Sequence, residues 1–177
     1  MSKFTNALVP SVQGLIDALQ VSVMTLSEIQ EDPRLAKAFE NMPSHYLGCY
    51  HPVEDVIMIR DEYLHNSTEI ILHELIHWAG AEGRLNRKWI TKSRAAMMTA
   101  DLDVIMDLNE TRDTEEATAQ IGMLKLVLVL GLNPAEYSDK TLSYLEDLLS
   151  FNLAKADRDS DKAVEYLVGF LGMRKAA

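Results

Sequence analysis

Two histidines and a glutamate stand at a spacing that can hold a metal ion and support hydrolysis. The stretch LHELIHW, residues 72–78, places His73 and His77 four positions apart, with Glu74 directly after the first histidine. Residues advance about 100° each around an α-helix, so the two imidazoles differ by only about 40° and can bind one ion. Glu74 lies about 60° from His77, near that ion but off the ligand face. This pattern matches metal-assisted hydrolysis, in which the carboxylate accepts a proton from an activated water.

The alternative is a buried helix whose histidines only hydrogen-bond to neighbouring carbonyl groups. The stretch from Asn66 to Ala79 is apolar almost all round, which is typical of a helix in the middle of a domain. We expect it to begin with a capping box of Asn66 and Glu69 and to end at Gly80. Three ionisable side chains on such a helix are costly to bury without a partner. A metal ion supplies that partner, so we favour the metal site.

A catalytic zinc site needs a third protein ligand and leaves its fourth position for water. The single cysteine, Cys49, excludes a cysteine-rich site, which leaves the carboxylates and three histidines, His45, His51 and His65. Glu116 lies near the start of a helix expected from Asp113 to Leu130, with Glu115 as a substitute. Glu116 can instead close a capping box with Asp113, and spacing alone does not decide between the two roles.

The composition is that of a globular protein with an acidic surface. The 177 residues are 47% hydrophobic and 25% charged, enough for one domain with a sizeable core. The net charge of −10 argues against a surface that tracks nucleic acid. The sequence starts without a signal-peptide pattern, and no apolar run reaches the roughly 18 residues that span a bilayer. We therefore expect a cytoplasmic protein that binds neither nucleic acid nor membrane directly.

The elements that position these residues predict one α+β domain over residues 1–177. In it, a small antiparallel sheet packs against a mostly helical body around a central HExxH helix. Residues 1–45 are expected to form one helix, Val12 to Gln30, and connecting turns, and residues 46–177 form the core. Tyr46 to Ile59 has the pattern of an antiparallel hairpin. Further helices are expected in parts of 88–109 and at 113–130, 139–153 and 160–171.

The segment YHPVEDVIMIRDEYLHNSTEIILHELIHWAGAEGRLNR, Tyr50 to Arg87, resembles the metallopeptidase domain of the ArdC antirestriction proteins and related phage polyvalent-protein zincins. HELIHW followed by RLNR is the most specific part of the likeness. EEATAQIG, residues 115–122, looks like the family's second glutamate-bearing helix motif. The tail from Tyr144, with ADRDSDKAVEYL, is similar to the family's C-terminal helices, so the likeness covers residues 46–171.

The resemblance implies a zincin fold of the glutamate-zincin type with Zn2+ as cofactor. It implies that His73, His77 and Glu116 bind the metal and that Glu74 is the general base. It also implies a phage or mobile-element setting, a host or phage protein as substrate, and a role in antirestriction.

The chain departs from that family in two ways. ArdC proteins carry an N-terminal domain that binds single-stranded DNA, whereas residues 1–45 here offer one helix and turns. The family tends to have an acidic residue where this chain has Gln120. Gln120 lies one turn beyond Glu116, where we expect its side-chain carbonyl to accept a hydrogen bond from a ligand histidine.

Four further residues are candidates for contacts with a substrate. Arg84 and Arg87 can clamp a carboxylate or phosphate, or pair with acidic neighbours in the chain. Tyr50 and His51 can help to stabilise an oxyanion if the hairpin turn overhangs the metal, or they can be a packed tyrosine and a solvated histidine. Cys49 is expected to be a small core residue on a strand.

Two functions of different class fit these observations. The first is a zinc metallopeptidase whose substrate lies extended along the Val56–Ile59 strand, taken as an exposed sheet edge. The second is a non-catalytic acidic zinc-binding protein that binds and inhibits a host DNA-acting defence enzyme. Glu74 favours the peptidase, because a binding protein has no need of a carboxylate beside the metal.

Overall fold

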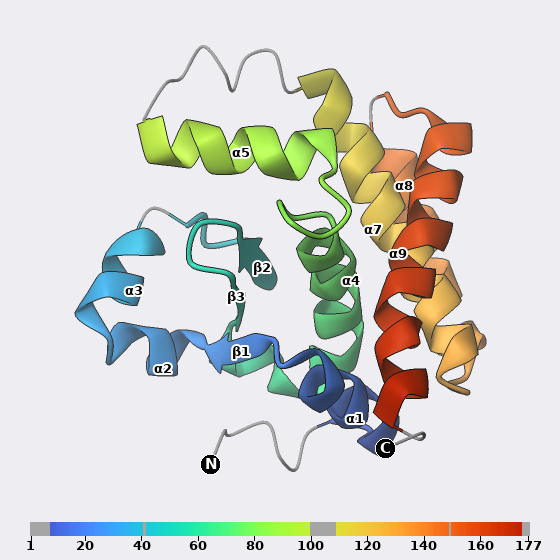
Figure 1. Cartoon of the computed structure of the whole chain (residues 1–177), viewed down its shortest axis with the longest axis horizontal. Coiled ribbons are helices and arrows are strands. Elements are labelled where there is room, and N and C mark those ends of the chain that lie inside the picture. Colours follow the sequence, from blue (N-terminus) through green and yellow to red (C-terminus); the bar gives the residue numbers. More distant parts are fainter. Residues whose placement is uncertain (1–7, 41, 100–108, 149, 175–177) are drawn as a thin grey trace.

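The helix that carries the HExxH motif, α4 (Ser67–Ala79), lies at the centre of the molecule (Figure 1). The structure, a computed structural model, describes residues 8–40, 42–99, 109–148 and 150–174. A three-stranded sheet lies on one side of α4, and the long helices α7 (Asn109–Val129) and α9 (Leu153–Arg174) lie on the other. The fold is α+β and mostly helical, as the sequence predicts.

Helix α4 is buried because apolar side chains surround it on nearly all sides. Leu72, Leu75 and Ile76 are fully buried and join one core cluster with Met123 and Leu126 of α7. Burying one such side chain contributes roughly 1.5–3 kcal/mol to stability. The helix that carries the two histidines is therefore held in place by its own core contacts.

The expected capping box at the start of α4 is wrong. A 3-10 helix, η2 (Asp61–Asn66), leads directly into α4, and the Asn66 side chain makes no capping hydrogen bond. Asn66 has φ −109° and ψ 16°, whereas a capping residue has extended backbone. The end of the helix is predicted correctly, because Gly80 occupies the C-cap and its N–H donates to the carbonyl of His77 at 2.9 Å.

The sheet has the strand order β1-β3-β2 and is mixed, not purely antiparallel. Strands β2 (Gly48–His51) and β3 (Val56–Ile59) form the predicted antiparallel hairpin. Strand β1 (Ser22–Thr25) pairs in parallel with the other side of β3. All four residues of β3 are buried, so the exposed edge expected at Val56–Ile59 for a substrate is wrong. The edge strand next to α4 is β2.

Strand β1 divides the long helix that the sequence predicts at Val12 to Gln30. The chain forms α1 (Pro10–Leu19), turns at Gln20 with φ 55°, runs through β1, and continues as α2 (Leu26–Gln30). The apolar spacing in this region fits a helix locally, but pairing with β3 outweighs that preference. The N-terminal part therefore contributes a strand to the core.

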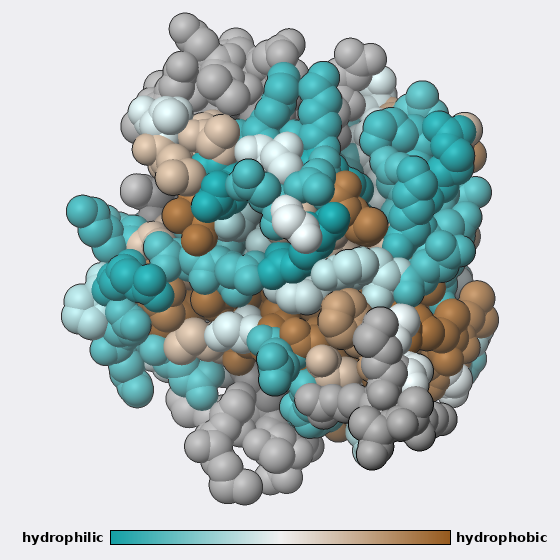
Figure 2. Space-filling view, viewed as in Figure 1, coloured by the Kyte–Doolittle hydropathy of each residue, from teal (hydrophilic) through white to brown (hydrophobic). Residues whose placement is uncertain are grey.

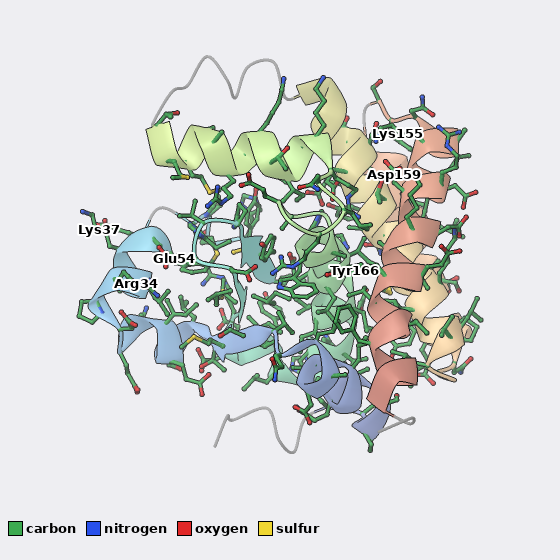
Figure 3. All side chains as sticks on the ribbon, in the orientation of Figure 1. Arg34, Lys37, Glu54, Lys155, Asp159 and Tyr166 are labelled. Atoms are coloured by element: carbon green, nitrogen blue, oxygen red, sulfur yellow. The ribbon has the colours of Figure 1, made fainter. Side chains whose placement is uncertain are left out.

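A second, smaller cluster covers the face of the sheet opposite α4. Helix α3 (Pro33–Ala38) is anchored to the hairpin turn by Arg34, whose Nη1 lies 3.2 Å from Glu54 Oε2 (Figure 3). Cys49 packs against this cluster, with its Sγ 3.3 Å from Met42 Sδ. Burial raises the pKa of the Cys49 thiol, and the charge of Glu74 adds to the shift. Cys49 is therefore a packed thiol on a strand, as the sequence predicts.

The C-terminal half of the chain is helical, and its helices α7 and α9 pack against α4. Helix α5 (Lys88–Thr99) matches the first part of the predicted 88–109 helix, and residues 100–108 of that prediction lie outside the described residues. Helix α7 starts four residues before the predicted Asp113. After a 3-10 turn, η3 (Pro134–Glu136), helix α8 (Ser138–Asp147) is shorter than the predicted 139–153 helix. Helix α9 extends beyond the predicted 160–171 at both ends.

The surface in view is largely hydrophilic, with a band of hydrophobic residues across its middle (Figure 2). Within the described residues, no helix combines the length and the apolar character that a membrane crossing requires.

Candidate metal centre

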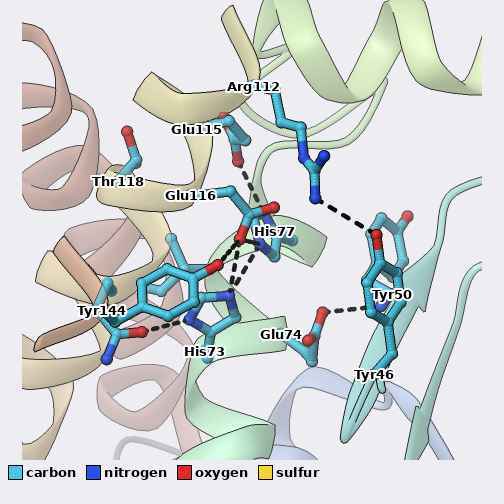
Figure 4. Close-up of polar contacts among 12 residues, drawn as sticks. Tyr46, Tyr50, His73, Glu74, His77, Arg112, Glu115, Glu116, Thr118 and Tyr144 are labelled. Atoms are coloured by element: carbon cyan, nitrogen blue, oxygen red, sulfur yellow. Dashed lines mark hydrogen bonds and ion pairs between the residues drawn. The ribbon is translucent and has the colours of Figure 1, made fainter. Parts of the chain in front are cut away.

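Three side chains from two facing helices converge on one point. His73 and His77 project from α4, and Glu116 projects from α7 (Figure 4). The two Nε2 atoms lie 3.2 Å apart, and Glu116 Oε2 lies 3.5 Å from His73 Nε2 and 3.8 Å from His77 Nε2. In the described part of the chain, these residues form a group whose donor atoms all lie within 4.8 Å of one another. The structure thus brings together the three residues named as ligands from the sequence and its resemblance.

The donor set fits a tetrahedral metal ion. Zinc binds nitrogen and oxygen ligands at roughly 2.0–2.2 Å, so two ligand atoms of a tetrahedral site are separated by roughly 3.3 Å. The separations of 3.2, 3.5 and 3.8 Å are close to this value. Two imidazoles and a carboxylate are also a ligand set of catalytic zinc sites, which keep one position open for water.

His77 is held by a buried ion pair. Its Nδ1–H donates to Glu115 Oε1 at 3.0 Å, and Arg87 donates to Glu115 through Nε at 2.9 Å and through Nη2 at 2.5 Å. The three side chains are 4% to 7% exposed. Burial opposes ionisation of Glu115, but the charge of Arg87 and the bond from His77 lower its pKa. Glu115 therefore orients a candidate ligand, and Arg87 pairs within the chain.

This arrangement favours a positive charge at His77 Nε2. Because Nδ1 keeps its proton and donates it in a hydrogen bond to Glu115, Nε2 is the nitrogen left to bind a proton or a metal, and it faces Glu116 and His73. Burial lowers the pKa of His77, but hydrogen bonds to Glu115 and Glu116 outweigh it and raise the pKa to about 10. Either a proton or a metal cation can supply the charge. Two facing imidazole nitrogens are well suited to share a metal.

His73 is oriented by a neutral partner. Its Nδ1–H donates to Gln120 Oε1 at 2.9 Å, and Gln120 Nε2 donates to the hydroxyl of Thr141 at 2.9 Å. With the amide oxygen toward the histidine, the Gln120 Nε2 group is left to donate to the threonine hydroxyl, which can accept. Gln120 thus contacts a candidate ligand histidine through its carbonyl, as the sequence predicts. Both imidazoles have Nδ1 occupied and Nε2 turned to the same point.

Glu116 faces the histidines instead of closing a capping box. Helix α7 begins at Asn109, so Asp113 lies inside the helix and cannot cap it. Asp113 Oδ2 accepts instead from the N–H of Ser150 at 3.0 Å. Burial opposes ionisation of Glu116, but its bonds to His73 and His77 hold its pKa well below the usual range. The capping role left open by the spacing is therefore excluded, and an ionised carboxylate points at the imidazoles.

Tyr144 of α8 adds a hydrogen bond to the same carboxylate. Its hydroxyl donates to Glu116 Oε2 at 2.8 Å, and its ring meets the ring of His73 edge-on at 6.1 Å. Burial and the charge of Glu116 raise the pKa of Tyr144, so the hydroxyl keeps its proton at neutral pH. Tyr144 therefore restrains Glu116 in the position it needs to meet the histidines.

Glu74 lies beside the three candidate ligands, and a hydrogen bond from strand β2 holds its carboxylate in place. Its Oε2 accepts the backbone N–H of Tyr50 in β2 at 2.8 Å, and the residue is 7% exposed (Figure 4). Burial raises the pKa of Glu74, while the charges of His73 and His77 lower it, and the net shift is upward. A carboxylate with a raised pKa is a better proton acceptor, which suits a general base.

Arg84 and the Tyr50 side chain form a structural network away from the ligand atoms. Arg84 Nη2 lies 2.5 Å from Asp55 Oδ2, and its guanidinium stacks 3.6 Å above the Trp78 ring. The Tyr50 hydroxyl donates to the other oxygen of Asp55 at 2.8 Å. These contacts join the loop after α4 to the hairpin turn. The structure supports the packed-tyrosine and ion-pair interpretations. Among the contacts of Tyr50 in the described part of the chain, the backbone N–H is the group that bonds to a residue of the site, Glu74.

The other histidines considered as ligands lie elsewhere. His51 Nδ1 accepts from the N–H of Glu54 at 3.2 Å, and its ring lies 5.0 Å from Phe39 in the second cluster. Successive strand residues point to opposite faces, so His51 faces away from the site when Tyr50 faces α4. Among the described residues, neither His45 nor His65 joins the group of potential metal ligands.

No family model and no curated protein matches the chain. A solved structure that resembles it is the metal-free crystal structure of the antirestriction protein ArdC from plasmid R388, at 19% sequence identity and a TM-score of 0.46. The alignment covers 92% of this chain and 52% of that one. The chain thus spans about half the length of that protein.

Sequence reasoning missed the roles of Tyr144, Thr141 and the Tyr50 N–H. Tyr144 and Thr141 belong to α8, and no local sequence pattern indicates that α8 lies beside α7. The adjacent glutamates did contain a usable signal. Neighbouring helix residues point about 100° apart, so Glu115 and Glu116 could not share one role. One contacts a histidine at Nδ1, and the other faces both Nε2 atoms.

Proposed function

We propose that this protein is a zinc-dependent peptidase. In this proposal, His73, His77 and Glu116 bind one ion and Glu74 acts as general base. The observation that carries it is the convergence of three donor atoms, with each histidine oriented through Nδ1, beside a buried carboxylate that is not one of the donors. Structural zinc sites use four protein ligands, whereas three ligands and a nearby base are typical of hydrolytic sites.

The chain's own residues divide the chemical work. When bound, zinc would supply a Lewis acid that lowers the pKa of a water and polarises the scissile carbonyl. Glu74, held by the Tyr50 N–H, accepts the proton of the attacking water and passes it to the leaving amine. Glu115 and Gln120 keep the imidazoles in the tautomer that presents Nε2. The antirestriction setting implied by the HELIHW and RLNR motifs belongs to the same proposal.

Replacing Glu74 with glutamine tests this function. The amide cannot accept a proton, so peptide hydrolysis should fall by roughly 10²-fold to 10⁴-fold. Zinc content, measured by elemental analysis, should remain at about one ion per chain, because Glu74 is not in the ligand set. Since the amide keeps an oxygen that can accept the Tyr50 N–H, the fold should be preserved. His73→Ala is the companion variant, which should lose both zinc and hydrolysis.

The same experiment separates the peptidase from the inhibitory binding protein considered above. If the protein is an inhibitor, wild type and Glu74→Gln should inhibit its target equally well. If Glu74→Gln matches wild type on a peptide library, or if wild type purified without chelator holds no zinc, the peptidase proposal is wrong.

A further inference from the structure

We propose that Arg112 is a specificity-determining residue that binds a carboxylate of the substrate, a role that rests on the peptidase function proposed above. Arg112 stands on α7 four residues before Glu116, a spacing that places two side chains on the same face of a helix. The side chain is exposed, and Figure 4 shows it reaching from α7 toward the hairpin side of the site.

The guanidinium of Arg112 bonds to a tyrosine on the hairpin side of the site. Its Nη2 donates to the hydroxyl of Tyr46, just before β2, at 3.4 Å. Figure 4 shows the guanidinium between the α7 side of the site, with Glu116, and the hairpin side, with Tyr46 and Tyr50. Arg112 is therefore an accessible cation beside the candidate metal ligands.

Arg112 has no carboxylate partner among the described residues. Elsewhere in the described chain, several arginines each form an ion pair, namely Arg34, Arg60, Arg84, Arg87 and Arg94. The partner of Arg112 is a neutral hydroxyl at the long end of hydrogen-bond distance. Such an exposed contact contributes little to stability. Within the part of the chain that the structure describes, structural support therefore does not account for a cation at this position.

Charge indicates what this cation would bind. Glu74 and Glu116 together offset the two positive charges of a bound zinc ion, and the whole chain carries a net charge of −10, so attraction of a substrate carboxylate needs a further cation beside the site. A guanidinium can pair with a carboxylate through two parallel hydrogen bonds. The weak Tyr46 contact is readily exchanged for that pair. An acidic side chain and a free peptide C-terminus both offer the required group.

The test compares wild type with Arg112→Gln, both full-length and zinc-loaded, on a peptide library. One half of the library has free C-termini and the other half has amidated C-termini, and cleaved peptides are identified by mass spectrometry. Wild type should favour Asp or Glu at one fixed position from the cleaved bond, or should require the free C-terminus. This preference should fall by about 10-fold in Arg112→Gln. Arg158→Gln, which changes an exposed arginine of α9, should keep it.

A binding measurement supplies a readout that does not need turnover. The Glu74→Gln protein is titrated with a cleavable peptide and with its counterpart in which the carboxylate is replaced by an amide. The Glu74→Gln protein should bind the acidic peptide about 10-fold more tightly than the amide counterpart. The double variant Glu74→Gln/Arg112→Gln should bind the two peptides with equal affinity.

Two failures can be distinguished. If wild type cleaves peptides with no preference for an acidic residue or for a free C-terminus, or if such a preference survives in Arg112→Gln, the inference is overturned while the peptidase function stands. If wild type cleaves no peptide, the peptidase proposal fails and this inference fails with it.

Discussion

His77 Nδ1 lies 3.0 Å from Glu115 Oε1 in the protein interior, and this contact ties the candidate metal centre to the core. The same carboxylate accepts hydrogen bonds from Nε and Nη2 of Arg87, and Nη2 also donates to the carbonyl of Ile76 in α4. The Glu115 carboxylate on α7 therefore connects that helix with α4 and with the segment that follows α4. The negative charge of Glu115 makes the imidazole of His77 a stronger metal ligand.

Glu115→Gln should weaken metal binding by about 10-fold to 100-fold, because the amide accepts the hydrogen bond from the histidine without contributing negative charge. The melting temperature should also fall, because Arg87 is left as an uncompensated buried charge. A double variant with Arg87→Met removes that charge, so it should recover part of the stability but not the metal affinity. Competition with a chromophoric chelator measures the affinity, and the exposed Glu165→Gln on α9 is the control. Unchanged zinc affinity in folded Glu115→Gln would contradict the role of this contact.

Gln120→Glu should act in the opposite direction on the other histidine. A carboxylate at this position adds charge to the partner of His73, and metal affinity should rise by up to roughly 10-fold to 100-fold. Thr141 can turn its hydroxyl to donate where it now accepts, so the new oxygen is satisfied. The metal-free variant should melt at a lower temperature than wild type because it buries another charge. Chelator competition and thermal unfolding with and without zinc check both effects, and equal or weaker zinc binding would refute the prediction.

Gly122→Ala should loosen the contact between α4 and α7. A Cβ at Gly122 would lie 2.7 Å from Ile76 Cδ1 and 2.9 Å from its Cγ1, so the helices or the isoleucine must shift. Such overpacking costs about 1–3 kcal/mol of unfolding free energy and should also weaken metal binding, because ligands lie on both helices. Gly169→Ala in α9 meets no atom within 4 Å and should stabilise the protein by about 0.5–1 kcal/mol. Denaturant unfolding compares the two, and similar effects in both would argue against the close contact.

Removing the metal should lower the melting temperature without unfolding the protein. A bound ion stabilises the native state by linkage, since its ligands come from two helices that are apart in the unfolded chain. The core cluster that contains Leu72, Leu75 and Leu126 is buried independently of the ion. Circular dichroism with and without chelator at room temperature should therefore show the same helix content. Loss of most of the helical signal on chelation would show that the metal is needed for folding.

The sequence by itself determined the elements whose signals are local. The i, i+4 spacing of His73 and His77, the hairpin before them, and the glycine that ends α4 all depend on residues a few positions apart. Helix geometry alone turns both imidazoles to one side. The same local reasoning placed Gln120 one turn from Glu116, and the structure shows it bonded to His73.

Only the tertiary structure decided which distant residues meet. The parallel pairing of β1 with β3 makes Val56–Ile59 a central strand, and it divided a segment whose local pattern favours a helix. Glu116 does not take part in a capping box, because α7 starts earlier than its local sequence signals indicate. Tyr144 reaches Glu116 across 28 positions, and Gln120 reaches His73 across 47. Such contacts depend on how amphipathic elements pack against one another. A hydrophobic periodicity of two or 3.6 residues indicates which face of an element is buried, but not which other face it packs against.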